Sequence, residues 1–198
     1  MMEYILLGIS LGMAAGLTPG PLLTYTIVAT LRGGWKAGVS VGIAPLLTDI
    51  PIILLSLLVL HVLPQEIVRL LSVAGGLVVI YLGIETARSA QHIEHLEIST
   101  HTSARQEMGK GVLVNFLNPN PYIFWGTVGG PLLLQAYAKH PALAVAFLAI
   151  FYTLLVGSHV GLALIVHHQR SGLRGPWYRR TLWALAIVLV IIGIRLIV

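Results

Sequence analysis

Six long apolar segments, nearly free of charged residues, limit the folds open to this chain more than any other feature of its sequence. They occupy residues 4–31, 37–63, 67–87, 111–134, 142–166 and 182–198. A helix needs about 20 such residues to cross the hydrocarbon core of a bilayer, and all but the last segment reach that length. A soluble chain of 198 residues that is 57% hydrophobic and 10% charged would lack the interior volume to bury so much apolar surface. The sequence therefore predicts an all-α membrane protein with six transmembrane helices.

A single polar stretch divides the chain into two halves with three predicted helices each. The first helix contains Thr-Pro-Gly-Pro at residues 18–21, and the fourth contains Asn-Pro-Asn-Pro at residues 118–121. Because each half has an odd number of helices, a second copy of the first half would insert into the membrane upside down. We therefore expect inverted repeats, with chance similarity between two apolar strings as the alternative. The predicted parts of this single transmembrane domain, 1–198, are a first repeat over 1–87, a cytoplasmic loop over 88–110 and a second repeat over 111–198.

Basic residues are distributed unevenly over the two sides of the predicted bundle. Nine of the 12 Lys and Arg residues fall in or beside the loops after the first, third and fifth helices. They are Arg32, Lys36, Arg88, Arg105, Lys110, Arg170, Arg174, Arg179 and Arg180. Cytoplasmic loops carry an excess of Lys and Arg, so we expect a multi-pass protein of the cytoplasmic (inner) membrane with both termini outside. The net charge of +5 is interpreted as this orientation signal and not as a sign of a nucleic-acid partner.

Both proline motifs place two prolines around one residue, and such a pair opens a helix because proline lacks a backbone donor and clashes with the preceding turn. At membrane depth, opened backbone occurs where it lines a cavity or is buried in protein, and it marks the binding sites of transporters. Helix N-termini favour a carboxylate, and open carbonyls favour an ammonium group. The sequence thus predicts a substrate site at the two breaks, with structural kinks, and capping of the opened turn by an asparagine, as the alternatives. The predicted site residues are Thr18, Pro19, Gly20, Pro21, Asn115, Asn118, Pro119 and Asn120.

Two ionisable residues lie deep inside predicted helices. Asp49 is in the second apolar segment, where a carboxylate costs at least ~2.5 kcal/mol on insertion scales and is expected to be functional. It is predicted to carry a proton or to bind an ammonium group, with a neutral acid held by a packing hydrogen bond as the alternative. His159, in the fifth segment, is the second candidate for proton coupling, although a packed, hydrogen-bonded imidazole is the commoner explanation. Glu85, at the end of the third segment, is expected to snorkel toward the membrane surface.

Glycines recur every four residues in several segments. Examples are Gly8, Gly12 and Gly16 in the first segment and Gly157 with Gly161 in the fifth. Small residues at this spacing let two helix backbones approach closely. We therefore interpret these glycines as packing positions.

The sequence carries no signature of a cofactor, a metal site or a common hydrolase. It has no cysteine, which removes thiolate metal sites, and it has no phosphate-binding loop or nucleophile elbow. The polar stretch contains His92, His95 and His101, but with no cysteine to join them we expect a solvated segment there. We predict no cofactor, no metal and no enzymatic activity, and we leave the role of this loop and homo-oligomerisation open.

Two stretches resemble hallmark motifs of the lysine exporter (LysE) family, which includes the homoserine/threonine exporters (RhtB). The first is Gly-Leu-Thr-Pro-Gly-Pro at residues 16–21 with Arg-Gly-Gly-Trp-Lys-Ala-Gly at 32–38, and the second is Gly-Lys-Gly-Val-Leu-Val-Asn-Phe-Leu-Asn-Pro at 109–119. The resemblance implies a secondary exporter of amino acids and similar metabolites that uses the proton gradient. The family often has Lys after the Asn-Pro pair and Gly before the acid of the second helix, where this chain has Asn120 and Thr48. Both differences fall where substrate should bind, so a lysine or threonine substrate is not implied.

We therefore predict a secondary active exporter of an amino acid or similar small polar metabolite, coupled to protons and surrounded by lipid. An exporter of a metal ion or other inorganic cation is the first alternative, although one deep carboxylate and no cysteine suit a soft or multivalent metal poorly. A membrane scaffold or an intramembrane enzyme is the second. Such an enzyme would need a nucleophile–base pair or a metal cluster at depth, for which Asp49 and His159 are the only candidates.

Overall fold

The computed structural model describes residues 2–58, 65–91, 103–169 and 176–198. Within these ranges the chain is helical apart from short turns and helix ends, and no strand is formed. The helices are α1 (Met2–Leu17), α2 (Pro21–Gly33), α3 (Trp35–Gly42), α4 (Pro45–Leu58), α5 (Gln65–Gln91), α6 (Ala104–Phe116), α7 (Pro119–Phe124), the π-helical segment η2 (Trp125–Gly129), α8 (Gly130–Lys139), α9 (Pro141–Gln169) and α10 (Pro176–Ile197). The prediction of an all-α chain is confirmed for the part of the sequence that is described.

Prolines and one glycine set many of the helix boundaries. The helices α2, α4, α7, α9 and α10 each begin with a proline, at a position where the missing N–H would have no partner inside the helix anyway. Gly34 joins α2 to α3 with φ of 79°, in the left-handed region that glycine enters without steric cost. Prolines and this glycine therefore divide the predicted apolar segments into a larger number of shorter helices.

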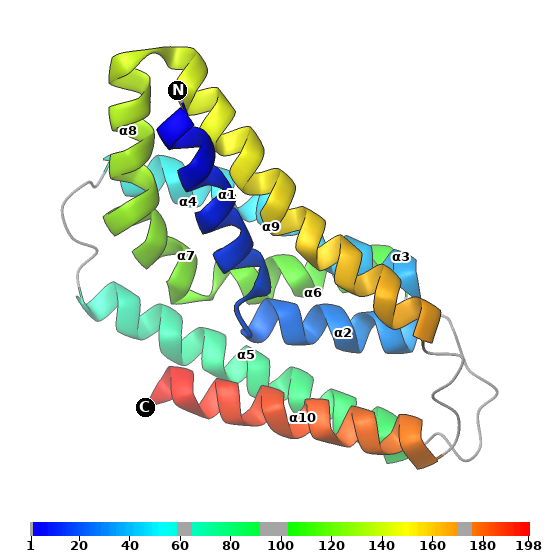
Figure 1. Cartoon of the computed structure of the whole chain (residues 1–198). Helices are drawn as coiled ribbons and strands as arrows, with labels where there is room; N and C mark the ends of the chain where they lie inside the picture. Colours follow the sequence, from blue (N-terminus) through cyan, green and yellow to red (C-terminus); the bar gives the residue numbers. More distant parts are fainter. Residues whose placement is uncertain (1, 59–64, 92–102, 170–175) are drawn as a thin grey trace.

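Two long helix pairs form opposite sides of the molecule (Figure 1). On one side α5 and α10 run antiparallel along each other, and on the other side α1 lies along α9. The shorter helices fill the space between these pairs: α2, α3 and α6 contact one another, while α4 contacts α6, α7, η2 and α8. The arrangement brings the beginning of the chain against its fifth predicted segment and the third segment against the sixth.

Buried apolar side chains form two main clusters. One cluster joins α2, α3, α5, α6 and α10 and includes Tyr25, Val41 and Val114. The other joins α1, α4, α7, η2, α8 and α9 and includes Trp125 and Phe147. Both clusters contribute residues to the wall of the cavity described below, so the candidate site lies where they meet.

Glycines allow α1 and α9 to pack closely. Gly8, Gly12 and Gly16 all face α9, and a methyl group at Gly12 would come within 2.6 Å of the backbone oxygen of Phe151. The predicted packing role is confirmed for this stripe. It is wrong for Gly157 and Gly161, because no described atom beyond the nearby backbone of α9 itself lies within 4 Å of the position that a Cβ atom would take at either residue.

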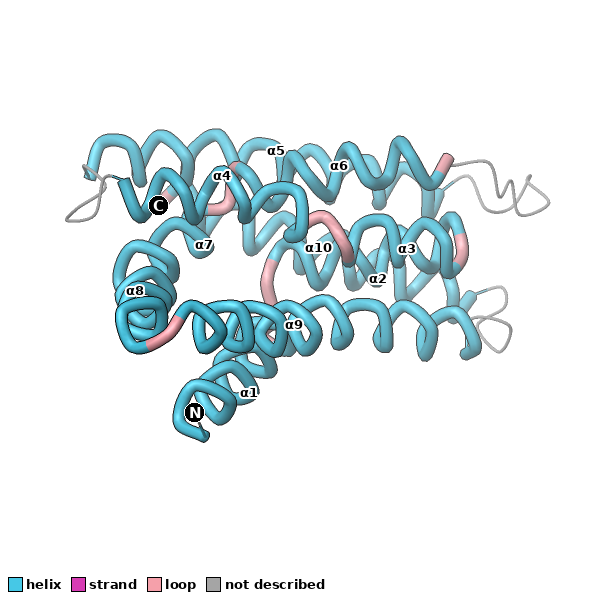
Figure 2. The backbone as a smooth tube through the Cα atoms, turned by 90° about the horizontal axis from the view of Figure 1, so that it is seen from above, coloured by secondary structure: helices cyan, strands magenta, loops and turns pink. Residues whose placement is uncertain are grey.

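Helix ends that carry basic residues gather at one end of the molecule. In Figures 1 and 2, α2, α5 and α9 finish there and α3, α6 and α10 begin there. The described basic residues within the first or last two turns of these helices are Arg32, Lys36, Arg88, Arg105, Lys110, Arg179 and Arg180. We call this region the basic end. The N-terminus and the turn between α8 and α9 lie at the opposite end.

Three described helical stretches are long and apolar enough to cross a membrane, namely Trp35–Leu58 (α3 with α4), Pro141–Gln169 and Arg179–Ile197. The pair α1 and α2, bent by 59°, gives a fourth if it is counted as one span. This is fewer than the six predicted. The fourth predicted segment is divided among the shorter helices α6, α7, η2 and α8. Length and composition thus give three to four candidate spans among the described residues, in keeping with a multi-pass membrane protein.

Two helices extend into the segment predicted as the polar loop, residues 88–110. The helix α5 continues to Gln91, and α6 begins at Ala104. Ser103 takes the N-cap position of α6 with extended backbone, although its side chain makes no capping hydrogen bond, and the residues after it favour helix. The histidines His92, His95 and His101 lie outside the described residues.

Candidate functional site

The first proline motif separates two helices. The helix α1 ends at Leu17, and α2 begins at Pro21. Between them, Thr18 donates its hydroxyl hydrogen bond to the carbonyl oxygen of Ala14, and Gly20 precedes α2 in extended backbone. The first turn of α2 has neither a side-chain cap nor an acidic residue. The predicted opening of the helix at this motif is confirmed, and it leaves an uncapped helix N-terminus at the break.

The second proline motif also separates two helices. The helix α6 ends at Phe116, and α7 begins at Pro119. The side-chain oxygen of Asn118 accepts a hydrogen bond of 3.1 Å from the backbone N–H of Asn120, so Asn118 caps the opened turn, as its alternative interpretation expected. Tyr122 donates to the carbonyl oxygen of Phe116 at 2.9 Å, which ties α7 to the open end of α6. The π-helical segment η2 follows, a feature that is frequent at functional sites.

Both breaks border one cavity of about 390 Å³. With the exception of Pro119, every residue predicted for substrate binding or proton coupling lines it. The predicted residues in the cavity wall are Thr18, Pro19, Gly20, Pro21, Asp49, Asn115, Asn118, Asn120 and His159. Pro119 is buried as the first residue of α7. The fold therefore brings together residues that the sequence singled out on four separate segments.

Hydrogen bonds from neighbouring helices hold Asp49, whose residue is 3% exposed. The hydroxyl of Tyr152 on α9 donates to Oδ2 at 3.0 Å, and the amide of Asn115 on α6 donates to Oδ1 at 3.0 Å. The same amide donates to Oγ1 of Thr48 at 2.6 Å. The carboxylate of α4 is thus oriented by α6 and α9 at the cavity wall.

His159 lies two helical turns after Tyr152 on α9, so the two side chains share a face of that helix. It is buried, and its Nδ1 atom has no hydrogen-bond partner among the described residues. Its Cβ atom sits against Gly42 of α3, where a methyl group would approach to 2.9 Å. The expectation of a fully hydrogen-bonded imidazole is therefore not met at Nδ1.

The cavity wall contains one acidic side chain, Asp49, and no Lys or Arg among the described residues that line it. Aromatic residues cover one part of the wall: the ring of Phe124 lies 5.1 Å from that of Trp125 and 5.3 Å from that of Phe151, measured between centroids. Across the described residues, no group of three His, Cys, Asp or Glu is placed to hold a metal ion. The described wall thus combines one carboxylate with amide, hydroxyl and aromatic side chains.

Sequence reasoning missed Tyr152 as a partner of Asp49. Tyr152 lies within an apolar segment where aromatic residues are common, and it is 103 residues away from the carboxylate it contacts. A buried tyrosine usually finds a partner for its hydroxyl, which is the one signal that could have drawn attention to Tyr152.

The expectation that Glu85 snorkels is wrong. Its Oε1 atom lies 2.9 Å from Arg32 of α2 and 2.7 Å from Lys110 of α6. Because these partners are distant in the sequence, the position of Glu85 near a helix end suggested a solvated carboxylate. In the fold, two cations bind it instead.

Comparison with known proteins identifies the family. The model of the family described as LysE type translocator matches residues 13–198. The chemotactic transduction protein ChpE from Pseudomonas aeruginosa is 27% identical over 134 residues, which cover 67% of this chain and 66%, just under two thirds, of that protein. No solved structure matches. Since the family model covers almost the whole chain, this protein belongs to the LysE type translocator family.

Proposed function

We propose that this protein is a secondary active exporter that moves an amino acid or similar small polar metabolite out of the cell in exchange for protons. Membership of the LysE type translocator family supports membrane export of a small molecule. The observation that carries the finer proposal is the cavity between the two helix breaks, with Asp49 as the acidic side chain in its described wall. A carboxylate in this position can bind either a proton or a cationic group of the substrate.

The cavity offers complementary groups for a zwitterion. Its volume of about 390 Å³ is within the range of pockets that enclose small ligands. An ammonium group would bind between the Asp49 carboxylate and the aromatic wall at Phe124 and Trp125, through charge and cation–π attraction. A carboxylate would bind at the uncapped first turn of α2, because a helix N-terminus favours negative charge. With no second acidic side chain and no Lys or Arg in the described wall, we expect the rest of the substrate to be uncharged.

Asp49 would exchange substrate for a proton. An ionised carboxylate attracts an ammonium group and a protonated one does not, so proton and substrate compete for the same side chain. Protonation from outside would release the substrate, and loss of the proton to the cytoplasm would prepare the site for the next molecule. His159 lines the same cavity and would pass the proton to or from Asp49.

Helix packing supports an arrangement of six spans as two inverted repeats. In two inverted repeats, the first, second and third predicted segments correspond to the fourth, fifth and sixth. A contact between the first and fifth segments must then be matched by a contact between the fourth and second segments. Both occur: α1 and α2 contact α9, and α6 and α7 contact α4. The third and sixth segments, α5 and α10, contact each other, as a pair related by the symmetry axis would. A single domain of two such repeats is therefore part of the proposal.

The distribution of charge supports a cytoplasmic basic end. Lys and Arg are enriched on the cytoplasmic side of membrane proteins, and the described terminal turns at one end of the molecule carry most of them. We propose that the protein lies in the inner membrane, with this end facing the cytoplasm and both termini on the outer side. Substrate would then reach the cavity from the basic end.

Counterflow in proteoliposomes tests the function. Purified protein would be reconstituted and offered amino acids with uncharged, basic and acidic side chains, and in parallel a panel of divalent metal ions. The proposal expects exchange of at least one amino acid and none of the metals. Exchange of metals alone would favour the cation exporter. Exchange of no solute would favour a role without transport, for which the name of the Pseudomonas relative, a chemotactic transduction protein, gives one example.

Asp49→Asn tests the proton coupling. The change keeps the size of the side chain and an oxygen that can accept the hydrogen bond of Tyr152, so the protein should fold. It removes the charge that binds both ligands, so export driven by a pH gradient in inside-out vesicles should be abolished. Glu3→Gln is the control, because Glu3 is exposed and far from the cavity. Export by Asp49→Asn at the wild-type rate would contradict the coupling role.

A further inference from the structure

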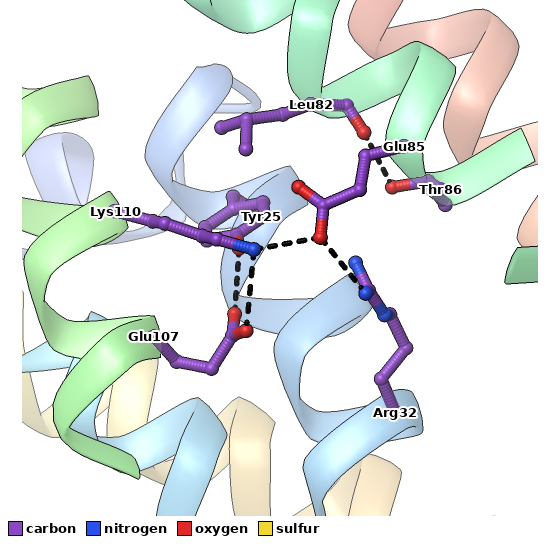
Figure 3. A network of polar contacts seen from close by, with 7 residues as sticks. All are labelled: Tyr25, Arg32, Leu82, Glu85, Thr86, Glu107 and Lys110. Atoms are coloured by element: carbon purple, nitrogen blue, oxygen red, sulfur yellow. Dashed lines mark hydrogen bonds and ion pairs between the residues drawn. The ribbon is translucent and has the colours of Figure 1, made fainter. Parts of the chain in front are cut away.

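A network of charged side chains joins three helices near the basic end (Figure 3). Glu85 of α5 accepts hydrogen bonds from Arg32 of α2 at 2.9 Å and from Lys110 of α6 at 2.7 Å. Lys110 also lies 3.6 Å from Glu107, one turn earlier on α6. Glu107 in turn accepts a hydrogen bond of 2.6 Å from the hydroxyl of Tyr25 on α2. One lysine is thus shared by two carboxylates, and each carboxylate also has a partner on α2.

The network is largely buried and electrically balanced. Glu107 is 1% exposed, and Lys110, the most open of the charged members, is 28% exposed. The two carboxylates and two cations cancel in charge. Buried ion pairs add little net stability, because removing the ions from water costs about as much as their attraction returns, but loss of one partner is strongly unfavourable. A network of this kind therefore favours one arrangement of the helices over others more than it stabilises the fold.

The network lies between the cavity and the basic end. On α2, residues 21–23 line the cavity, and Arg32 lies more than two turns further along the helix. On α6, Asn115 lines the cavity, and Glu107 lies about two turns away from it. Among the described residues of α2 and α6, none beyond these positions toward the basic end borders the cavity. The turns between are filled by buried apolar side chains, which are Val28, Ala29, Val41, Leu82 and Val114. The cavity is therefore closed toward the basic end, and the network seals that closure.

We infer that these five residues, Tyr25, Arg32, Glu85, Glu107 and Lys110, form a lock that holds the basic end closed and must open for substrate to enter the cavity from that side. The lock joins α2 and α5 of the first half to α6 of the second half. A transporter exposes its site to one side at a time through two arrangements of the same helices. In the second arrangement the contacts of Lys110 with Glu85 separate, and water reaches α2 beside Tyr25. The role in export rests on the proposed function, whereas the lock itself can be tested without a substrate.

Cysteine reactivity tests the lock directly, because the chain has no cysteine of its own. Ala29 is 0% exposed and lies about one turn from Tyr25 and from Arg32 on the same face of α2. In Ala29→Cys, a methanethiosulfonate reagent should react slowly with the new thiol. Adding Glu85→Gln removes the charge that holds Arg32 and Lys110, and the reaction should become about tenfold faster or more, as expected when a buried ion pair loses one partner.

The matched control is Glu3→Gln in the same Ala29→Cys background. Glu3 forms an exposed ion pair with Lys139 at 3.7 Å, at the opposite end of the molecule, so its loss should leave the labelling rate unchanged. An unchanged rate after Glu85→Gln, in protein that elutes and melts like its parent, overturns the proposal. If Glu85→Gln does not fold, Lys110→Gln gives the same test, since it breaks the link between α6 and α5 alone.

A cross-link tests whether the lock must open during transport. In Glu85→Cys with Lys110→Cys, a bifunctional thiol reagent would tie α5 to α6, across the two halves. In Arg32→Cys with Glu85→Cys, the same reagent would tie α2 to α5 within the first half. We expect the first cross-link to abolish counterflow reversibly and the second to leave most of it.

Three outcomes separate the lock from the transport function. Full exchange through the first cross-link overturns the lock and leaves the exporter standing. An equal loss of counterflow with both cross-links also overturns the lock. In that case transport would not depend specifically on the separation of α6 from α5. Faster labelling after Glu85→Gln in a protein that exchanges no solute supports the lock and overturns the exporter.

Discussion

Tyr152 is a neutral side chain that controls the position of a charged one on another helix. Its hydroxyl donates to Oδ2 of Asp49 at 3.0 Å, while Asn115 donates to Oδ1. The ring of Tyr152 stacks on Trp125 with centroids 6.3 Å apart, which fixes the direction from which the hydroxyl donates. The carboxylate is therefore held from two sides, and the cavity presents it in one orientation.

Tyr152→Phe should weaken substrate binding while leaving the protein folded. The change removes one hydrogen bond to a carboxylate, an interaction that contributes about 1.5–3 kcal/mol, so KM for counterflow should rise about tenfold or more. Tyr137→Phe, at an exposed tyrosine of α8, is the control and should behave as wild type. An unchanged KM for Tyr152→Phe would show that Asp49 does not depend on this hydroxyl during transport.

At the scale of helices, the two proline motifs turn long apolar segments into shorter helices whose ends meet at the cavity. The double change Pro19→Ala with Pro21→Ala restores two backbone donors and raises helix propensity, by up to about 3 kcal/mol at an interior position. The protein should insert normally and keep or raise its Tm, yet lose export, because a continuous helix no longer offers an open turn. The matching change at Pro119 and Pro121 should act in the same way. Full export by either double variant, measured in proteoliposomes, would exclude the breaks from the mechanism.

Glycines on two helices should respond oppositely to the same substitution. At Gly12 a methyl group would meet the backbone oxygen of Phe151 at 2.6 Å, so Gly12→Ala must push α1 away from α9. At Gly157 no described atom beyond the nearby backbone of α9 lies within 4 Å of the added methyl group, and alanine gains about 0.8–1 kcal/mol of helix propensity. Thermal unfolding in detergent should show a Tm lowered by several degrees for Gly12→Ala, at roughly 2–4 °C per kcal/mol for a chain of this size. It should show an equal or higher Tm for Gly157→Ala. Equal losses would mean that α1 does not depend on the glycine stripe.

The sequence was sufficient to predict features that a residue imposes on its own helical turn. It was insufficient to predict contacts between residues that only the tertiary fold brings together. Proline opens the helix that contains it, so both breaks were predictable, and a lone deep carboxylate identified Asp49. Hydrophobicity alone could not show that Tyr152 reaches Asp49 from α9, or that Glu85 meets Arg32 and Lys110. It also overestimated Gly157, because spacing shows which residues share a face and not whether another helix packs on that face.

At the scale of the whole molecule, the cavity and the lock describe one state of a cycle. The cavity lies where the two apolar clusters meet, and the packed cluster of α2, α3, α5, α6 and α10 separates it from the basic end. If the basic end is cytoplasmic, the described state is closed to the cytoplasm, and an exporter must leave it to collect substrate. The direction of transport therefore depends on orientation, which is the property that a single labelling experiment can establish.

Two exposed positions at opposite ends of the molecule report the orientation. Ser103 precedes α6 at the basic end, and His140 lies in the turn between α8 and α9 at the other end. Because Lys and Arg accumulate on the cytoplasmic side, an impermeant thiol reagent should label His140→Cys in intact spheroplasts and should label Ser103→Cys only after permeabilisation. The native chain has no cysteine, so all signal comes from the new thiol. The opposite pattern would place the basic end outside. The lock would then close the outer side in the described state instead of the cytoplasmic side.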